Sequence, residues 1–320
     1  MMRLLAAPGS KTLLCLLALC LAFAVNAETE SAGRKQVLTT IKPLQLLVKA
    51  IAGDRLDVEV LLQPQQSPHH YQLRPSDRAR LANAAQVYWI GAGMETFLAR
   101  TALALPAGQL QTLGKSLAVA GDHDEHDHHH DHAGIGSDPH LWLDYQQIVQ
   151  MSEAIEQGLA VLSPADAAQF AANRQQLVRQ LEQLDRQAAS EFLAYQKRGF
   201  IMSHAAYGRL LAHYGLVGGV ALTDEHGQVA GAKRWQSLEK FMTEQSPTCF
   251  MRDPSEHQSI EETFLQRYPV QVIDVDTMGV DISATADGFV AFYRNVTGGV
   301  AKCLKLAEGV ESLKRNGDGE

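Results

Sequence analysis

Residues 121–132, with the sequence GDHDEHDHHHDH, contain the densest set of potential metal ligands in the chain. Six of these twelve residues are histidine and five are acidic. Imidazole nitrogens and carboxylate oxygens bind zinc and related ions. The stretch has no apolar residue that could pack, so we expect a flexible loop. Such a loop would either hold several metal ions weakly or be only a solvated acidic loop. Its histidines are His123, His126, His128, His129, His130 and His132.

Three sparser histidines could form a tighter site. His69, His140 and His204 stand at expected loop or strand-end positions. Each alone is more often structural, but together they resemble the three nitrogen donors of a tetrahedral zinc site. Asp276 ends an expected strand and could be the fourth ligand, or it could simply cap a loop. The segments concerned are SPHHYQLRPSD, SDPHLWLD, FIMSH and VQVIDVD.

The remaining histidines carry weaker indications of function. His213 follows His204 at helical spacing and His257 stands beside Glu256 in a polar stretch, and we expect both at the surface. His226 follows two acidic residues in an expected post-strand loop, for which a solvated loop is the simpler interpretation.

Alternating apolar segments and helical patterns must position these side chains. Short β-branched segments predict strands, and apolar residues three or four apart predict helices. This order favours mostly parallel sheets covered by helices, in two α/β halves joined by one long helix. The expected strands are 36–41, 56–62, 86–91, 200–204, 217–222, 248–253 and 270–276, and the expected helices are 43–53, 76–84 with Ser76 as cap, 148–162 and 163–198.

The N-terminus has the pattern of an export signal. Arg3 and Lys11 precede the apolar segment LLCLLALCLAFAV, and small residues follow, which predicts cleavage after Ala27. Removing two positive charges changes the net charge from −8 to −8 − 2 = −10. Such an acidic chain is a poor nucleic-acid binder, because phosphate needs cationic partners.

Two cysteines, Cys249 and Cys303, remain after export. In an oxidising compartment such a pair is most simply one disulfide, the alternative being two buried thiols. Leu19 before Cys20 does not fit a lipidation signal, so we expect no direct membrane anchor.

The motifs quoted above resemble the periplasmic zinc-binding proteins of ABC transporters, within the cluster A-I metal solute-binding family. SPHHYQLRPSD, DPHLWLD, SHAAYGRL and DVDTMG correspond to four of its motifs across the mature chain, and the histidine-rich insertion is typical of the zinc branch. The resemblance implies two α/β lobes joined by a rigid long helix, with the metal in the interlobe cleft. It also implies a disulfide between Cys249 and Cys303.

Carried over by motif, the resemblance implies His69, His140 and His204 as ligands of Zn(II), with Asp276 or water as the fourth. Histidine at 204, where manganese-type relatives have glutamate, favours zinc. We expect a monomer that delivers zinc to a membrane ABC permease, with affinity falling as pH drops through about 6.5. The expected divisions are a signal peptide 1–27, an N-terminal lobe 28–162 with a histidine-rich loop 121–137, a linking helix 163–198, a C-terminal lobe 199–312 and a polar tail 313–320.

Three alternatives remain open at this stage. Manganese or iron could be the cargo of the same type of protein. An exported zinc metalloenzyme would also use three histidines and an open position, although the sequence has no HExxH motif. An adhesin with the same fold is the third.

Overall fold

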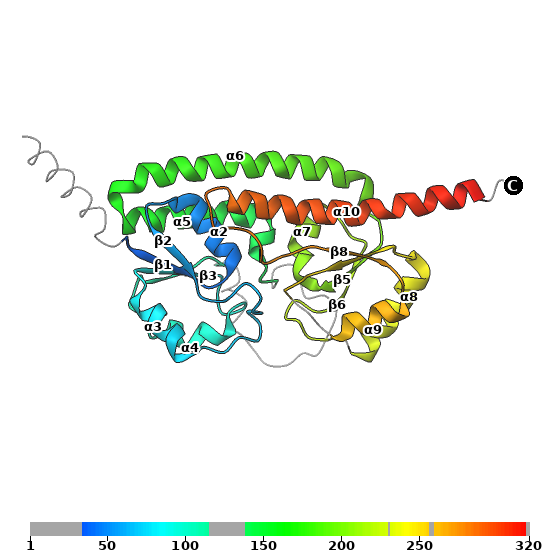
Figure 1. Cartoon of the computed structure of the whole chain (residues 1–320), viewed down its shortest axis with the longest axis horizontal. Helices are drawn as coiled ribbons and strands as arrows, with labels where there is room; N and C mark the ends of the chain where they lie inside the picture. Colours follow the sequence, from blue (N-terminus) through cyan, green and yellow to red (C-terminus); the bar gives the residue numbers. More distant parts are fainter. Residues whose placement is uncertain (1–33, 115–137, 230, 256–258, 318–320) are drawn as a thin grey trace, which may run out of the picture. The chain divides into compact units, whose positions relative to one another are not determined.

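The computed structural model describes residues 34–114, 138–229, 231–255 and 259–317. The expected signal peptide and the histidine-rich stretch lie outside these residues. From Gln36 onward the chain forms one compact unit. Figure 1 shows its two sheets and the helices around them.

The first sheet contains four parallel strands in the order β2-β1-β3-β4. Parallel strands need crossover connections, and helices supply most of them here. Helix α2 contacts both β1 and β2. The elements of this N-terminal lobe are β1 (Gln36–Thr39), α2 (Lys42–Ala52), β2 (Asp57–Val60), α3 (Pro75–Asn83), β3 (Gln86–Trp89), η1 (Thr96–Leu98), α4 (Ala99–Ala102) and β4 (Leu110–Thr112).

The second sheet repeats this strand order, as β6-β5-β7-β8, and all its strands are again parallel. Each lobe therefore has its second strand beside its first, with the third and fourth on the other side. The elements of this C-terminal lobe are β5 (Phe200–His204), η6 (Ala205–Tyr207), α7 (Gly208–His213), β6 (Gly219–Thr223), α8 (Ala232–Gln245), β7 (Cys249–Arg252), α9 (Ser259–Arg267) and β8 (Gln271–Asp274).

Long helices join the two lobes. After η3 (Leu141–Leu143) and α5 (Tyr145–Leu162), the expected linking helix is observed as α6 (Ala167–Phe192), preceded by η4 (Pro164–Asp166) and followed by η5 (Leu193–Tyr195). Together they make 3 + 26 + 3 = 32 helical residues. The fold is thus the expected one of two parallel-sheet lobes connected by a long helix.

A second long helix, α10 (Gly288–Gly317), was not anticipated as a link between the lobes. It contacts α6 and α2 as well as β7 and β8, and Figure 1 shows it beside α6. The expected polar tail at 313–320 is therefore helical through Gly317. None of the helices in the described ranges is long and apolar enough to cross a bilayer.

The expected cap of α3 is not observed. Pro75 is the first helical residue, so the cap position belongs to Arg74, and Ser76 lies inside the first turn. Proline is favoured at this first position because its fixed φ suits a helix and no backbone bond is lost there.

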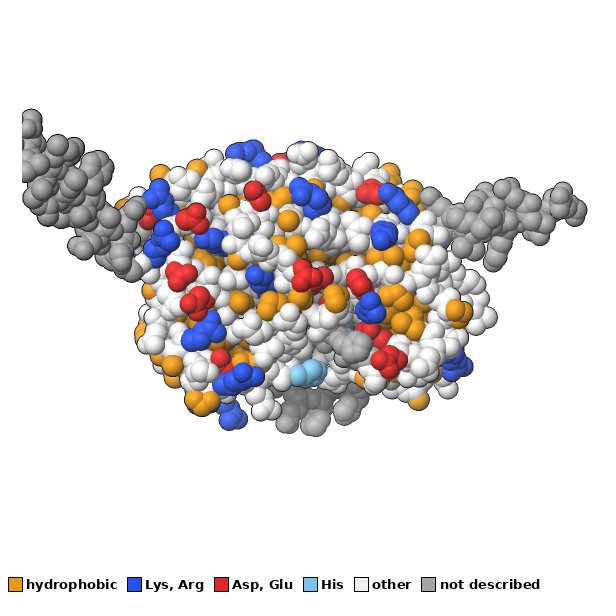
Figure 2. Space-filling view, viewed as in Figure 1, with side chains coloured by type: hydrophobic (Ala, Val, Ile, Leu, Met, Phe, Trp, Pro, Cys, Tyr) orange, Lys and Arg blue, Asp and Glu red, His pale blue; other side chains and the backbone are white. Residues whose placement is uncertain are grey.

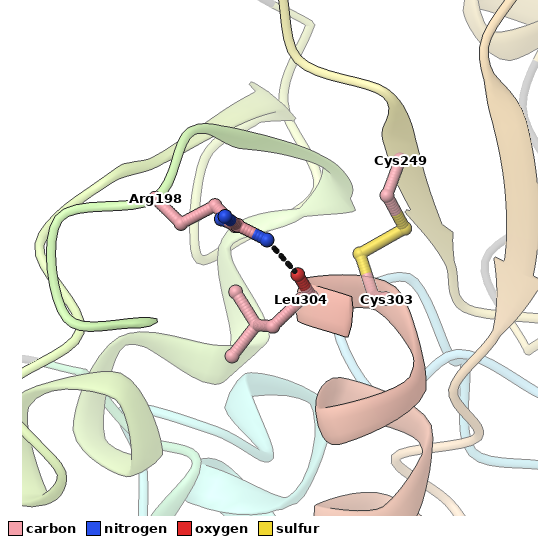
Figure 3. Close-up of a disulfide and its surroundings, with 4 residues drawn as sticks. All are labelled: Arg198, Cys249, Cys303 and Leu304. Carbon is pink, nitrogen blue, oxygen red and sulfur yellow. Dashed lines mark hydrogen bonds between the residues drawn. A yellow bond between two sulfur atoms is a disulfide. The ribbon is translucent and has the colours of Figure 1, made fainter. Parts of the chain in front are cut away.

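The expected disulfide is present and joins β7 to α10 (Figure 3). The sulfur atoms of Cys249 and Cys303 are 2.03 Å apart. Close by, Nη1 of Arg198 donates a hydrogen bond of 3.0 Å to the carbonyl oxygen of Leu304. The covalent bond therefore ties the second sheet to the helix that also packs on α2 and α6.

Candidate metal centre

The three sparse histidines come together in the structure. One nitrogen from each of His69, His140 and His204 lies within 4.8 Å of the other two. Their ring centroids are 5.2–5.5 Å apart. Nε2 of His140 is 3.3 Å from Nε2 of His204. Two ligands at about 2.0–2.1 Å from one zinc ion in tetrahedral geometry would be about 3.3–3.4 Å apart. This pair is therefore already spaced for a shared ion.

Each of these histidines comes from a different part of the chain. His204 is the last residue of β5, His140 directly precedes η3, and His69 stands in the loop between β2 and α3. In open parallel sheets, ligands bind beyond the carboxyl ends of the strands. The cluster obeys this rule and takes donors from both lobes.

The loop of His69 is fastened at its far end by Asp77. One oxygen of this carboxylate accepts hydrogen bonds from Tyr71 Oη, at 2.7 Å, and from the Arg74 amide, at 2.8 Å. The loop therefore enters α3 in a defined direction, which limits the positions that His69 can reach.

Asp138 fixes the orientation of the His140 ring. Its Oδ1 lies 2.7 Å from His140 Nδ1 and also accepts a bond from the His140 amide at 3.0 Å. The carbonyl oxygen of Asp138 in turn accepts a bond from Nε of Arg209. A carboxylate on the far nitrogen of a ligating imidazole directs the near nitrogen to the metal and raises its basicity. Nε2 of His140 therefore points into the cluster.

Replacing Asp138 with asparagine should raise the dissociation constant for zinc about 10–100-fold, as changes to such supporting partners generally do. The side chain would still accept a hydrogen bond, but it would lose its charge. Asp144→Asn is the matched control, because Asp144 caps α5 through Gln146 and Gln147. Competition with a chelator measures both constants, and equal losses in the two variants would contradict this role for Asp138.

His204 is oriented by a hydroxyl group. Its Nδ1 is 3.3 Å from Oγ1 of Thr223, and that hydroxyl donates its single proton to the carbonyl of Ser203. The hydroxyl can then only accept from His204, so Nδ1 carries the ring proton. Nε2 is left with its lone pair facing His140, as a metal ligand requires.

A buried network of hydrogen bonds next to the His140 and His204 rings connects the two lobes. Oγ of Ser203 accepts from the Asp253 amide at 3.0 Å, and the Asp253 carboxylate accepts from the hydroxyl of Thr277. The Thr277 carbonyl accepts from Nε1 of Trp142 at 2.8 Å, and the Trp142 ring centroid is 5.2 Å from that of His140. The segment of His140 is therefore connected by hydrogen bonds to strand β5 and to the loops that follow β7 and β8.

Burial keeps two of the imidazoles neutral. Burial, helped by the neighbouring rings of His140, His226 and His70, lowers the pKa of His69 to about 3. Burial and the same kind of neighbours hold the pKa of His204 well below its usual 6.5. Both side chains are thus neutral donors at neutral pH. The expectation that affinity falls through pH 6.5 moves to a lower pH for these two groups.

Asp276 does not join the group of three histidines. Among the described residues, that group contains no carboxylate oxygen within the same 4.8 Å limit. Asp276 Oδ1 accepts from the amides of Met278 and Gly279, at 2.9 and 2.8 Å, and Oδ2 accepts from Val280 at 2.6 Å. Its carboxylate therefore shapes the loop after β8, which is the loop role considered from the sequence.

His213, expected at the surface, and His226, expected in a solvated loop, both have defined surroundings, whereas His257 lies outside the described residues. Nε2 of His213 is 2.7 Å from Oδ1 of Asp185 on α6, so this residue ties α7 to the long helix. His226 is exposed, but its ring centroid lies 5.8 Å from that of His69. The sequence signal that could have revealed His226 is its place just after β6, the strand that pairs with β5.

Fold and site define the class of this molecule: a two-lobed α/β protein with a candidate metal centre of three histidines between its lobes. Residues 37–303 match the family described as zinc-uptake complex component A, periplasmic, or ZnuA. The chain belongs to this family, which confirms the resemblance noted from its motifs.

Individual relatives are also similar to this chain over most of its length. The high-affinity zinc uptake system protein ZnuA of Yersinia pestis is 30% identical over 289 residues, covering 84% of this chain and 91% of the relative. A crystal structure of ZnuA matches with a TM-score of 0.68 and 22% identity, covering 84% of this chain and 99% of the other. The structure of the periplasmic zinc-binding protein TroA of Treponema pallidum matches with a TM-score of 0.71 and 20% identity, covering 85% of this chain and 99% of TroA. At 20–22% identity these two structural matches show that the fold is shared, and nothing beyond the fold.

Proposed function

We propose that this protein is a periplasmic solute-binding protein that captures one Zn(II) ion with His69, His140 and His204. It passes the ion to a membrane ABC permease, acts as a monomer, and is exported with cleavage after Ala27. It performs capture and delivery, not catalysis. The observation that supports the tight site most is the 3.3 Å separation of the His140 and His204 Nε2 atoms, which suits one tetrahedral ion.

The donor atoms favour zinc over manganese or iron as the cargo. All three donors are imidazole nitrogens, and the carboxylate of Asp276 is engaged by three backbone amides. Harder ions such as manganese prefer carboxylate and water oxygens, and a given nitrogen site binds zinc more tightly than manganese or iron(II). A site without an evident carboxylate ligand therefore selects zinc.

Delivery follows from the separate origins of the ligands. His69 belongs to the loop after β2 of the first sheet, and His204 ends β5 of the second. Any movement that separates the lobes takes at least one donor from the ion. Because an incomplete donor set binds far more weakly, such a movement would release zinc to the permease.

Residues 121–132 serve as an accessory store on this proposal. Deleting them should lower the number of zinc ions bound per chain and leave one tight site. The reason is that His69, His140 and His204, all among the described residues, already bring three nitrogen donors together. Titration calorimetry of the mature protein and of the deletion variant measures both stoichiometry and affinity.

The same titration tests the function itself. Retention of one tight zinc ion by the deletion variant supports a site built from the three sparse histidines. Loss of tight binding on deletion, with the folded state intact by circular dichroism, would place the site in the acidic-histidine stretch instead. A mature protein without any tight zinc ion would contradict the proposal as a whole.

A further inference from the structure

The three-histidine cluster leaves one ligand position of a tetrahedral ion to be supplied. Zinc in proteins is usually four-coordinate, and a binding protein that must exclude competing reactions gains from a fourth protein donor. Asp276 is held in its own loop by Met278, Gly279 and Val280. These bonds take up most of the acceptor positions of a carboxylate, which number about four, so a side chain outside the set expected from the sequence competes with Asp276 and water for this position.

His226 is the additional imidazole that lies against the cluster. Its ring centroid is 5.8 Å from that of His69, close to the 5.5 Å that separates His69 from each of the other two rings. His226 follows the strand that pairs with the strand of His204, so its loop lies beside two of the three donors.

The backbone that carries His226 is well fixed. Strand β6 pairs with β5 so that Thr223 is the register partner of His204. Directly afterwards, Oδ1 of Asp224 accepts bonds from the amides of His226, at 3.0 Å, and Gln228, at 2.8 Å. A backbone bond of 3.0 Å from Asp224 to the Gln228 carbonyl closes the turn. The side chain therefore starts from a defined point near the ion position.

The side chain itself has room to move. His226 is exposed, whereas His140 and His204 are each only 2% exposed. Figure 2 shows that imidazole is accessible to solvent on the face drawn there, in the lower half of the view. A change of rotamer can thus bring a nitrogen of His226 toward the cluster without any movement of the strands.

We propose that His226 is the fourth zinc ligand, an exposed imidazole that turns from the loop after β6 onto an ion held by His69, His140 and His204. This inference rests on the proposed function. It makes the binding set four nitrogens, three of them buried or half-buried and one accessible from solvent. The accessible ligand would be the first to leave the ion during release.

The test compares His226→Ala with His70→Ala in the full mature chain. His70 is also exposed and its ring is 6.4 Å from His69, so it is a matched control. Chelator competition gives the affinity of the tight site, and zinc-edge X-ray absorption with one equivalent of zinc counts the imidazole ligands. We expect His226→Ala to weaken binding about 10–100-fold, less than loss of a buried donor because water replaces the ring.

The ligand count makes the inference falsifiable even if a variant fails to fold. Four imidazoles in the parent protein, and three with one oxygen in His226→Ala, would support it. Three imidazoles in the parent, or an affinity unchanged by His226→Ala, would overturn it and leave the proposed function standing. An equal loss in His70→Ala would overturn it too. A parent protein without a tight zinc ion would instead remove the proposed function.

Discussion

Replacing His140 with alanine should weaken zinc binding by about 10²–10³-fold. Structural zinc sites with four ligands bind with about 10–16 kcal/mol, so one ligand contributes about 2.5–4 kcal/mol. His140 is buried, and its Nε2 is already 3.3 Å from that of His204. A water molecule in the emptied space would be a poorer ligand. Competition with a chelator of known affinity measures the loss.

His69→Ala and His204→Ala should each produce losses of the same order. His213→Ala is the control, because its imidazole bonds to Asp185 on α6 instead of joining the cluster. An affinity that survives any one of the three ligand changes within tenfold would contradict a shared ion. A comparable loss in His213→Ala would show that the assay reports general damage to the fold.

The second large effect is the pH at which the site empties. Two exposed imidazoles with the usual pKa of about 6.5 would together weaken zinc binding about hundredfold at pH 5.5, because protons compete for their nitrogens. Burial lowers the pKa of His69 to about 3 and holds that of His204 well below 6.5. We therefore expect these two residues to cost no affinity at pH 5.5.

The lowered pKa values of His69 and His204 also define how the stability of the apoprotein changes with pH. Below about pH 6.5 the unfolded chain binds protons at these two imidazoles, whereas the folded apoprotein does not until their lowered pKa values are reached. The free energy of unfolding of the apoprotein should therefore decrease as the pH falls from about 6.5 toward about 3. Chelator competition between pH 7.5 and 5 measures the zinc affinity, and denaturant unfolding of the apoprotein over the same range measures the free energy of unfolding. A free energy of unfolding of the apoprotein that stays constant between pH 7.5 and 5 would contradict neutral, buried donors at these two positions.

One ligand of this site could be predicted from its position at the end of a strand. His204 closes an apolar strand that was observed over the same residues, 200–204, and parallel strands must present their carboxyl ends at one edge. The motif resemblance then supplied His69 and His140. For His204 the apolar pattern of the strand and the rule for parallel sheets indicated the same position, so the sequence was sufficient to predict this residue as a candidate ligand.

The remaining parts depend on contacts that no local pattern encodes. The sequence left Asp276 as either a ligand or a loop cap, and the turn after it offers three amides that bond to its two oxygens. His226 looked like a solvated loop residue, because only the pairing of Thr223 with His204 brings its loop to the cluster. Asp138 was passed over for the same reason. Its role depends on its approach to the far nitrogen of His140.

The second connecting helix was missed on similar grounds. The sequence of α10 shows that it is a helix, but its contacts with α2 and α6 are properties of the assembled fold. The identical strand order of the two lobes was equally hidden, since no sequence repeat accompanies it. Topology can be kept where sequence similarity is lost, because packing depends on apolar pattern more than on identity.

The most direct test of the central claim is a structure of the zinc-loaded mature protein with anomalous data at the zinc edge. We expect one strong anomalous peak about 2.0–2.1 Å from a nitrogen of each of His69, His140 and His204. A principal peak within residues 121–132, or one that contacts fewer than two of these three histidines, would contradict it.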